Sequence, residues 1–174
     1  MKPWLYTFCL LSLLAACTEI SYKEPQPKGI RVLPEIPRKL QGRYLIEENN
    51  EPVDTLYAEK FGYRLGKDEV ASLSDSLVLK QYKGYYFLSS RNNYAWYLRI
   101  LRIQKNGDLV FMEMKAFPRE DENIRNYISE LETVVPVVIT EVDNETYYII
   151  DPQPKQLLEL IRKGFFKEVV FKRM

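Results

Sequence analysis

The stretch that decides the fold runs from residue 96 to residue 116 and reads WYLRILRIQKNGDLVFMEMKA. Two runs rich in aromatic and apolar residues, 96–103 and 109–116, flank the polar loop QKNGD. Such runs are typical of strands, and Asn106-Gly107 is the preferred pair for a type I′ turn because both residues accept positive φ. The stretch therefore predicts an antiparallel β-hairpin.

Further strand-like runs lie on both sides of this hairpin and are separated by turn residues. Several contain aromatic and β-branched residues, which favour a pleated, half-buried surface. The expected strands are residues 43–48, 55–64 with an interruption at Gly62, 76–82, 85–90, 137–141, 145–150 and 165–173.

Two amphipathic helices are expected among these strands. Within residues 119–132 the apolar side chains recur at i, i+3, i+4 and i+7, which is one face of a helix. Residues 154–163 begin with a proline and are followed by Gly164, the favoured start and end signals of a helix. The sequence thus predicts an α+β fold, mainly antiparallel β: a twisted sheet or partly closed barrel with two amphipathic helices packed on it.

The composition excludes several classes of function. Lys and Arg number 25 against 24 Asp and Glu, so no basic excess is present to neutralise phosphates, and we expect no nucleic-acid partner. The chain has no His and only two Cys, Cys9 and Cys17. The commonest general base and the commonest transition-metal ligand are therefore missing, and we predict no metal site and no cofactor.

No catalytic motif is recognisable, so we predict that the protein is not an enzyme. The sequence lacks a phosphate-binding glycine loop, a Gly-x-Ser-x-Gly elbow and a Ser-x-x-Lys motif. Hydrolysis by a carboxylate pair such as Glu47 with Glu113 stays open as an alternative, since both lie in predicted strands. We favour the interpretation that these two residues are solvated positions on their strands.

One polar loop offers the side-chain types that recur at binding sites. It joins two predicted strands and combines planar contact area with hydrogen-bonding groups. The alternative is a polar turn whose tryptophan belongs to the core. The candidate interaction residues are Arg91, Asn92, Asn93, Tyr94 and Trp96.

The N-terminus has the layout of a secretory signal peptide. Lys2 is followed by a mostly apolar run, residues 4–14, which is too short to span a bilayer, because about 20 apolar residues are needed. The run ends in Leu14-Ala15-Ala16-Cys17, which resembles the lipobox of bacterial lipoproteins. The resemblance implies a signal peptide over residues 1–16 that is cut before Cys17. It also implies diacylglycerol on the Cys17 sulfur and a palmitate-type acyl chain on the new amine.

Residues 17–38 contain four prolines among charged and polar residues and show no apolar period. We expect the lipidated Cys17 to continue into an extended tether over this segment. At about 3.1 Å per residue, such a tether would lift the domain roughly 60 Å from the membrane. Residues 39–174 are expected to form one β-rich globular domain, whose membrane attachment rests on the acyl chains.

The stretch DSLVLKQYKGYYFL at residues 75–88, taken with the lipobox, resembles small lipoproteins of Bacteroidota-type bacteria. This resemblance implies an outer-membrane address in the cell envelope. The residues after Cys17, TEIS at 18–21, hold a single acid, so a periplasm-facing anchor is favoured over the cell surface. Residues 40–44, LQGRY, look like the first-strand Gly-x-aromatic feature of lipocalins.

Two functions follow from these expectations. The first is a lipid-anchored, non-enzymatic interaction or assembly module with an envelope protein as its partner. The alternative is a calycin-like binder of a small apolar ligand. A ligand binder would leave inward-facing strand positions unfilled, whereas an interaction module would have a filled core.

Overall fold

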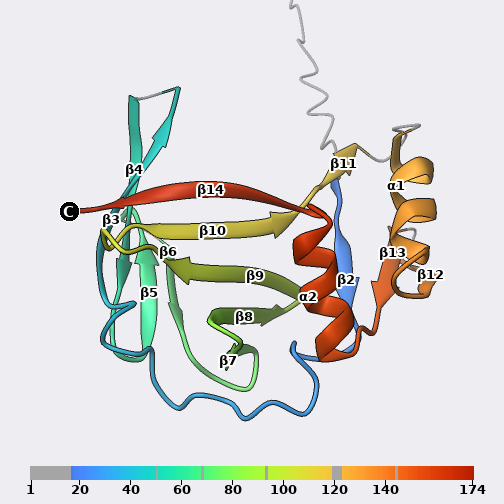
Figure 1. Ribbon diagram of the computed structural model, residues 1–174, viewed down its shortest axis with the longest axis horizontal. Helices are drawn as coiled ribbons and strands as arrows, with labels where there is room; N and C mark the ends of the chain where they lie inside the picture. The colour runs from blue at the N-terminus through green and yellow to red at the C-terminus, as the bar shows by residue number, and fades with distance from the viewer. Residues whose placement is uncertain (1–16, 50, 68, 93, 119–122, 144) are drawn as a thin grey trace, which may run out of the picture.

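The hairpin that decided the prediction is formed by β9 (Trp96–Ile103) and β10 (Leu109–Met114), which pair antiparallel with Ile103 opposite Leu109. A computed structural model describes residues 17–49, 51–67, 69–92, 94–118, 123–143 and 145–174 (Figure 1). The predicted type I′ turn at Asn106-Gly107 is wrong, because only Gly107 has positive φ. The last strand pair leaves five residues in the loop, which is too many for a two-residue turn.

Antiparallel neighbours extend the hairpin into a sheet that we call the central sheet. Its strand order is β7, β8, β9, β10, β14. The added strands are β7 (Leu77–Tyr82), β8 (Tyr85–Arg91) and β14 (Phe166–Arg173). Two-residue turn geometry with positive φ at both residues occurs between β7 and β8, at Lys83-Gly84.

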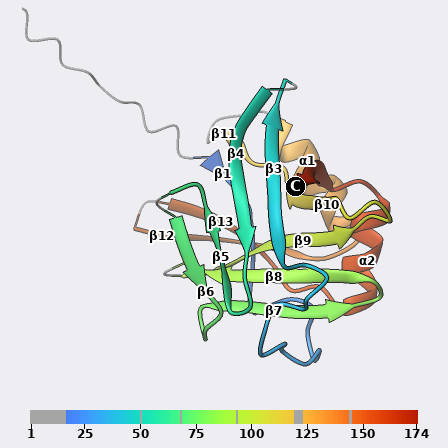
Figure 2. The same cartoon turned by 90° about the vertical axis from the view of Figure 1, so that its left-hand side faces the viewer.

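A second group of strands, which we call the covering sheet, lies across one face of the central sheet (Figures 1 and 2). It joins the central sheet where Lys172 and Arg173 of β14 pair with β3. The predicted single run 55–64 is in fact two strands, and β6 was not predicted. The covering sheet consists of β3 (Gly42–Glu48), β4 (Glu51–Ala58), β5 (Gly62–Leu65) and β6 (Glu69–Ser72).

Gly62 explains why the chain can turn back at this point. A Cβ atom placed on Gly62 would lie 2.1 Å from the carbonyl oxygen of Ala71, closer than any real contact. Only glycine therefore allows β5 and β6 to approach as they do, and the glycine that interrupts the predicted strand is what lets β6 pair.

The predicted tether over residues 17–38 is wrong, because this N-terminal segment packs on the domain. Ile20 and Tyr22 are only 1% exposed, and their strand β2 (Ile20–Tyr22) lies between β13 (Glu145–Ile150) and β9. The pairing of β2 with β13 is parallel. A short apolar run can be held in a sheet by strands distant in sequence, a contact that local composition does not reveal.

The remaining strands lie beside this segment. β12 (Val137–Val142) pairs with β13 and forms an edge of the sheet. The first described residues form β1 (Cys17–Thr18), which pairs antiparallel with β11 (Phe117–Pro118). The predicted signal peptide, residues 1–16, lies outside the described residues.

Both predicted helices are confirmed. Helix α1 (Asn123–Glu132) ends before Pro136 as expected, and the start predicted for it at residues 119–122 lies outside the described residues. Helix α2 (Pro154–Arg162) begins with proline, and at its N-terminus the Gln153 backbone N–H donates to the side-chain oxygen of Gln156 at 2.8 Å. Neither helix in the described part of the chain is long and apolar enough to cross a bilayer.

The central sheet is apolar on both faces, so it separates two hydrophobic cores. On one face Leu98, Ile100 and Met112 pack with the buried sides of α1, α2 and β2. On the other face Leu101 and Leu109 meet the covering sheet. The predicted α+β class with a mainly antiparallel, twisted sheet is confirmed; the sheet as a whole does not close.

Candidate ligand-binding cavity

A cavity of about 360 Å³ lies between the central sheet and the covering sheet. Its size falls at the lower end of the range typical of small-molecule sites, about 300–1,000 Å³. The side chains that line it are mostly apolar and come from both sheets. They include Leu56 and Ala58 of the covering sheet and Leu79, Leu88, Leu101 and Phe111 of the central sheet.

The alternation of side chains along the central strands explains the apolar lining. In β9, Leu98 and Ile100 face the helices while Leu101 faces the covering sheet. In β10, Met112 faces the helices while Phe111 lines the cavity. The inward-facing positions are therefore apolar as in an ordinary core, but the two sheets do not meet closely enough to fill the space between them.

A charged group closes one part of the cavity wall. Arg99 lines the cavity, and its guanidinium makes a bidentate pair of hydrogen bonds with the carboxylate of Glu19. Its Nε lies 3.2 Å from Oε2 of Glu113, which is the residue opposite Arg99 on β10. Burial alone would lower the pKa of Arg99, but hydrogen bonding and charge from Glu19, joined by the Glu113 charge, raise it above its ordinary value.

Three further polar residues line the cavity: Tyr63, Glu69 and Ser90. Burial raises the pKa of Tyr63, and the negative charge of Glu69 raises it further against the opposing charge of Arg99. Tyr63 is thus a neutral phenol near two charged groups. Glu69 is exposed while lining the cavity, so its carboxylate lies at the rim. Such an arrangement can hold an apolar body and orient one polar end.

The predicted interaction loop is only partly associated with this site. Arg91 and Asn92 border an open surface hollow that Glu19, Ser90 and Arg99 also line. Asn93 lies outside the described residues. Arg91 and Asn92 of the loop thus lie beside Ser90 and Arg99, which belong to the polar part of the cavity lining. The sequence did not predict this proximity.

The two aromatic residues of the loop serve other contacts. The hydroxyl of Tyr94 donates to Asp143 at 2.6 Å, and its ring meets Tyr147 edge-on with centroids 6.1 Å apart. Trp96 packs against the core on the helix side of the central sheet, with the Arg91 guanidinium 5.9 Å from its ring. These contacts fix the loop to the β12–β13 hairpin rather than leaving its aromatic rings free.

The two carboxylates of the pair considered from the sequence, Glu47 and Glu113, are each held by a different cation. Glu113 pairs with Arg99, and Glu47 pairs with Lys172 on the neighbouring strand β14. Each carboxylate therefore has its own cation, so the two do not resemble an acid–base pair sharing one cleft. In the described part of the chain no group of three or more Cys, Asp or Glu side chains is placed to hold a metal ion.

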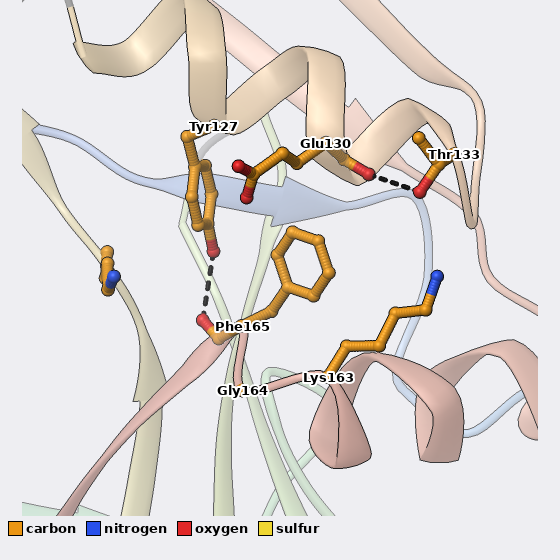
Figure 3. Close-up of a pocket in the computed structure, with 7 residues that line it drawn as sticks. Tyr127, Glu130, Thr133, Lys163, Gly164 and Phe165 are labelled. Atoms are coloured by element: carbon orange, nitrogen blue, oxygen red, sulfur yellow. Dashed lines mark hydrogen bonds between the residues drawn. The ribbon is translucent and has the colours of Figure 1, made fainter.

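A second hollow, of about 290 Å³, lies where α1 meets the start of β14 (Figure 3). The Tyr127 hydroxyl donates to the Phe165 carbonyl at 3.0 Å, and the Thr133 hydroxyl donates to the Glu130 carbonyl at 2.7 Å (Figure 3). Burial raises the pKa of Tyr127, which keeps its hydroxyl protonated as the donor. The Tyr127 bond fastens helix α1 to the residue before β14, and the Thr133 bond closes the end of the helix, so we assign the hollow a structural role.

The sequence held no direct signal for the cavity, because its leucines are the residues that a filled core would also use. The nearest signal was the apolar character of both faces of the central strands, which indicates that both faces are covered. Comparisons of the chain with protein-family models, with curated proteins and with solved structures found no match.

Proposed function

We propose that this chain is a lipid-anchored protein of the cell envelope whose domain binds a small apolar molecule between the central and covering sheets. The observation that carries the proposal is the apolar cavity of about 360 Å³. Unfilled inward positions are what distinguishes a ligand binder from a module with a filled core. The absence of a recognisable catalytic motif in the sequence supports binding rather than catalysis.

The proposed location follows from the lipobox. Acyl chains on Cys17 would hold the chain at the outer membrane, with the domain facing the periplasm. Two acyl chains suffice for stable attachment, because each buried methylene contributes about 0.8 kcal/mol. Lipidation would also remove the thiol of Cys17, the only cysteine that remains once residues 1–16 are cut.

The binding proposal is tested by native mass spectrometry of the full chain extracted from its own membranes. We expect a stoichiometric small molecule on the wild-type protein. Ala58→Phe should remove it, because Ala58 lines the cavity and a phenyl ring would occupy the space. Ala116→Phe adds the same group at an exposed position and should retain the molecule.

The same variants separate loss of binding from loss of folding. Filling a cavity with apolar atoms restores contacts, so Ala58→Phe should keep or raise the melting temperature. Ala58→Leu is a milder version with the same expected direction. A wild-type protein that carries no small molecule, or a folded Ala58→Phe variant that keeps it at full occupancy, would overturn the proposal.

A second candidate function, docking of an envelope protein, is favoured by one observation. The edge strand β12 exposes Val138 and Ile139, at 61% and 59% respectively. An edge strand with exposed apolar side chains can accept a strand from a partner. Crosslinking in native membranes tests this: Ile139→Lys should abolish a specific crosslinked partner, and an unchanged crosslinking pattern would argue against docking at β12.

A further inference from the structure

The polar wall of the cavity is rich in acceptors and poor in free donors. A guanidinium has five N–H donors. In Arg99, Nε faces Glu113, two donors meet the Glu19 carboxylate and another reaches the Leu98 carbonyl at 3.2 Å. A ligand anion would find at most one donor here, so it could not form a two-pronged pair without displacing Glu19.

In contrast to the guanidinium of Arg99, the carboxylate of Glu69 at the rim is not occupied by a described protein partner. The backbone of Glu69 belongs to the β5–β6 pair, but its side chain makes no hydrogen bond or ion pair with any residue in the described ranges, although it lines the cavity. Arg99, the one cation among the described lining residues, already faces the two carboxylates of Glu19 and Glu113. The lining residues and their direct partners therefore carry an excess of negative charge, which favours a cation and disfavours an anion.

Several other cations, among them Arg64, Lys67, Arg91 and Lys167, lie near the lining residues but do not line the cavity themselves. The Arg91 guanidinium lies against the ring of Trp96, which belongs to the helix side of the central sheet. Lys167 is the cross-strand neighbour of Glu113 on β14, and it is exposed to solvent. Solvent screens the charge of Lys167, so it offsets little of the negative field inside the cavity.

We propose that the ligand is an amphiphile with one apolar chain and an amine-bearing, positively charged head. This inference rests on the proposed function. The chain lies against Leu79, Leu88, Leu101 and Phe111, and the head lies at Glu69. The volume of the cavity, near the lower limit of ligand sites, accommodates one apolar chain.

The N-terminal segment indicates where such a molecule would come from. Glu19, which clamps Arg99, follows Cys17 by two residues, so their Cα atoms lie within about 7.6 Å of each other. Lipidation of Cys17 would therefore place the polar wall of the cavity beside the membrane surface. Amine-headed lipids and free amine-bearing amphiphiles that partition into the membrane share this chemistry.

The test uses the full chain in phosphatidylcholine nanodiscs and three photoactivatable probes. The probes share one dodecyl chain with a diazirine and differ only in the head: an amine, an alcohol or a carboxylate. After irradiation, peptide mapping measures labelling of the cavity strands. We expect the amine probe to label them about tenfold more than the carboxylate probe, with the alcohol between them.

Glu69→Gln is the matched variant for the head group. It should lower labelling by the amine to the level of the alcohol and leave the alcohol unchanged. Glu51→Gln removes an exposed carboxylate that does not line the cavity, so it should change nothing. A vesicle-extraction arm with amine-headed lipid separates the membrane source from the free one, and uptake from either supports the proposal.

The outcomes distinguish a failure of the proposed binding function from a failure of the head-group proposal. If no probe labels the cavity strands, the proposed function itself is overturned. If the alcohol and carboxylate probes label them and the amine probe does not, only the head-group inference fails. An amine signal that is unaffected by Glu69→Gln would also overturn the placement of the head at Glu69.

Discussion

The buried lysine beneath the N-terminal segment makes the most informative target for mutation. Lys80 of β7 is 6% exposed, and its Nζ donates to the carbonyls of Pro25 at 2.7 Å and Pro27 at 2.9 Å. No carboxylate in the described ranges lies within ion-pair distance of it. We predict that Lys80→Met loosens this segment from the domain while leaving the central sheet intact.

The magnitude follows from two opposing effects. Each hydrogen bond to a charged group contributes about 1.5–3 kcal/mol, so losing both costs about 3–6 kcal/mol. The substitution also removes a buried charge whose desolvation opposes folding, which recovers part of that cost. Lys28 holds the same segment to Asp151 at 2.7 Å, so release is local. We expect a net loss of about 2 kcal/mol in docking free energy, or roughly 30-fold in the opening equilibrium.

Amide hydrogen exchange measures this opening directly. The Gln26 amide donates to the Ser89 hydroxyl at 3.1 Å, and the Leu33 amide donates to the Leu79 carbonyl at 2.8 Å. Both amides should exchange roughly 30-fold faster in Lys80→Met, because exchange follows the local opening free energy.

The control and the refuting result are well defined. Lys105→Met removes an exposed lysine in the β9–β10 loop and should leave both amides unchanged. The amides of β9 and β10 should keep their protection in both variants. Wild-type exchange at Gln26 and Leu33 in a folded Lys80→Met protein would refute the role of this lysine in docking.

The contribution of Lys80 to folding stability also depends on pH, and the direction of this dependence follows from its lowered pKa. Burial lowers the pKa of Lys80 below 10.5, and the charge of Glu24 offsets this in part. Between the lowered pKa and 10.5 the unfolded chain binds more protons than the folded chain, so this residue's contribution to stability rises with pH. The difference in urea midpoint between wild type and Lys80→Met should therefore grow across that window.

Three further predictions concern other parts of the molecule. Burial, followed by the charges of Tyr127 and Glu19, raises the pKa of Tyr22 well above 10.0, so the folded state holds a proton that the unfolded state releases. Stability should fall as pH rises past about 10, and Tyr22→Phe should reduce that fall in urea unfolding; an equal fall in both proteins would contradict it. Arg99→Met leaves the carboxylates of Glu19 and Glu113 without their cation and should lower the free energy of unfolding in urea by about 2 kcal/mol. The loss is smaller than for a fully buried ion pair because solvent reaches all three groups. A loss under about 0.5 kcal/mol would count against a stabilising role of these ion pairs. Cys17→Ser should abolish detergent-phase partitioning and leave an uncleaved or soluble form, whereas membrane partitioning at the mature mass would rule out lipidation at Cys17.

Elements with a clear local period were predictable from the sequence. The buried residues of α1, among them Ile124 and Leu131, fall at the spacing of one helical face. The runs that became β8, β9 and β10 are long enough for their strand character to stand out. Turn type was harder, because it depends on where the last strand pair forms and not on the Asn-Gly pair alone.

Features that depend on distant contacts were not predictable. Strand β2 has only three residues, too few to show a period, and its neighbours are Trp96 and residues 148–150. The prolines around it suggested an extended tether, but two of their carbonyls accept hydrogen bonds from Lys80. The cavity was also hidden, since whether two apolar sheet faces meet or leave a gap depends on how the sheets cross.

The docked N-terminal segment changes what lipidation of Cys17 would mean. A free segment over residues 17–38 would have held the domain tens of ångströms from the membrane, a distance suited to reaching a partner. In the structure β1 begins at Cys17, and Glu19 is already fixed to Arg99. Only a few residues therefore separate the proposed anchor at Cys17 from the cavity wall at Arg99. Exchange of an amphiphile with the adjacent bilayer therefore fits this geometry better than long-range contact, because the molecule need not cross open water.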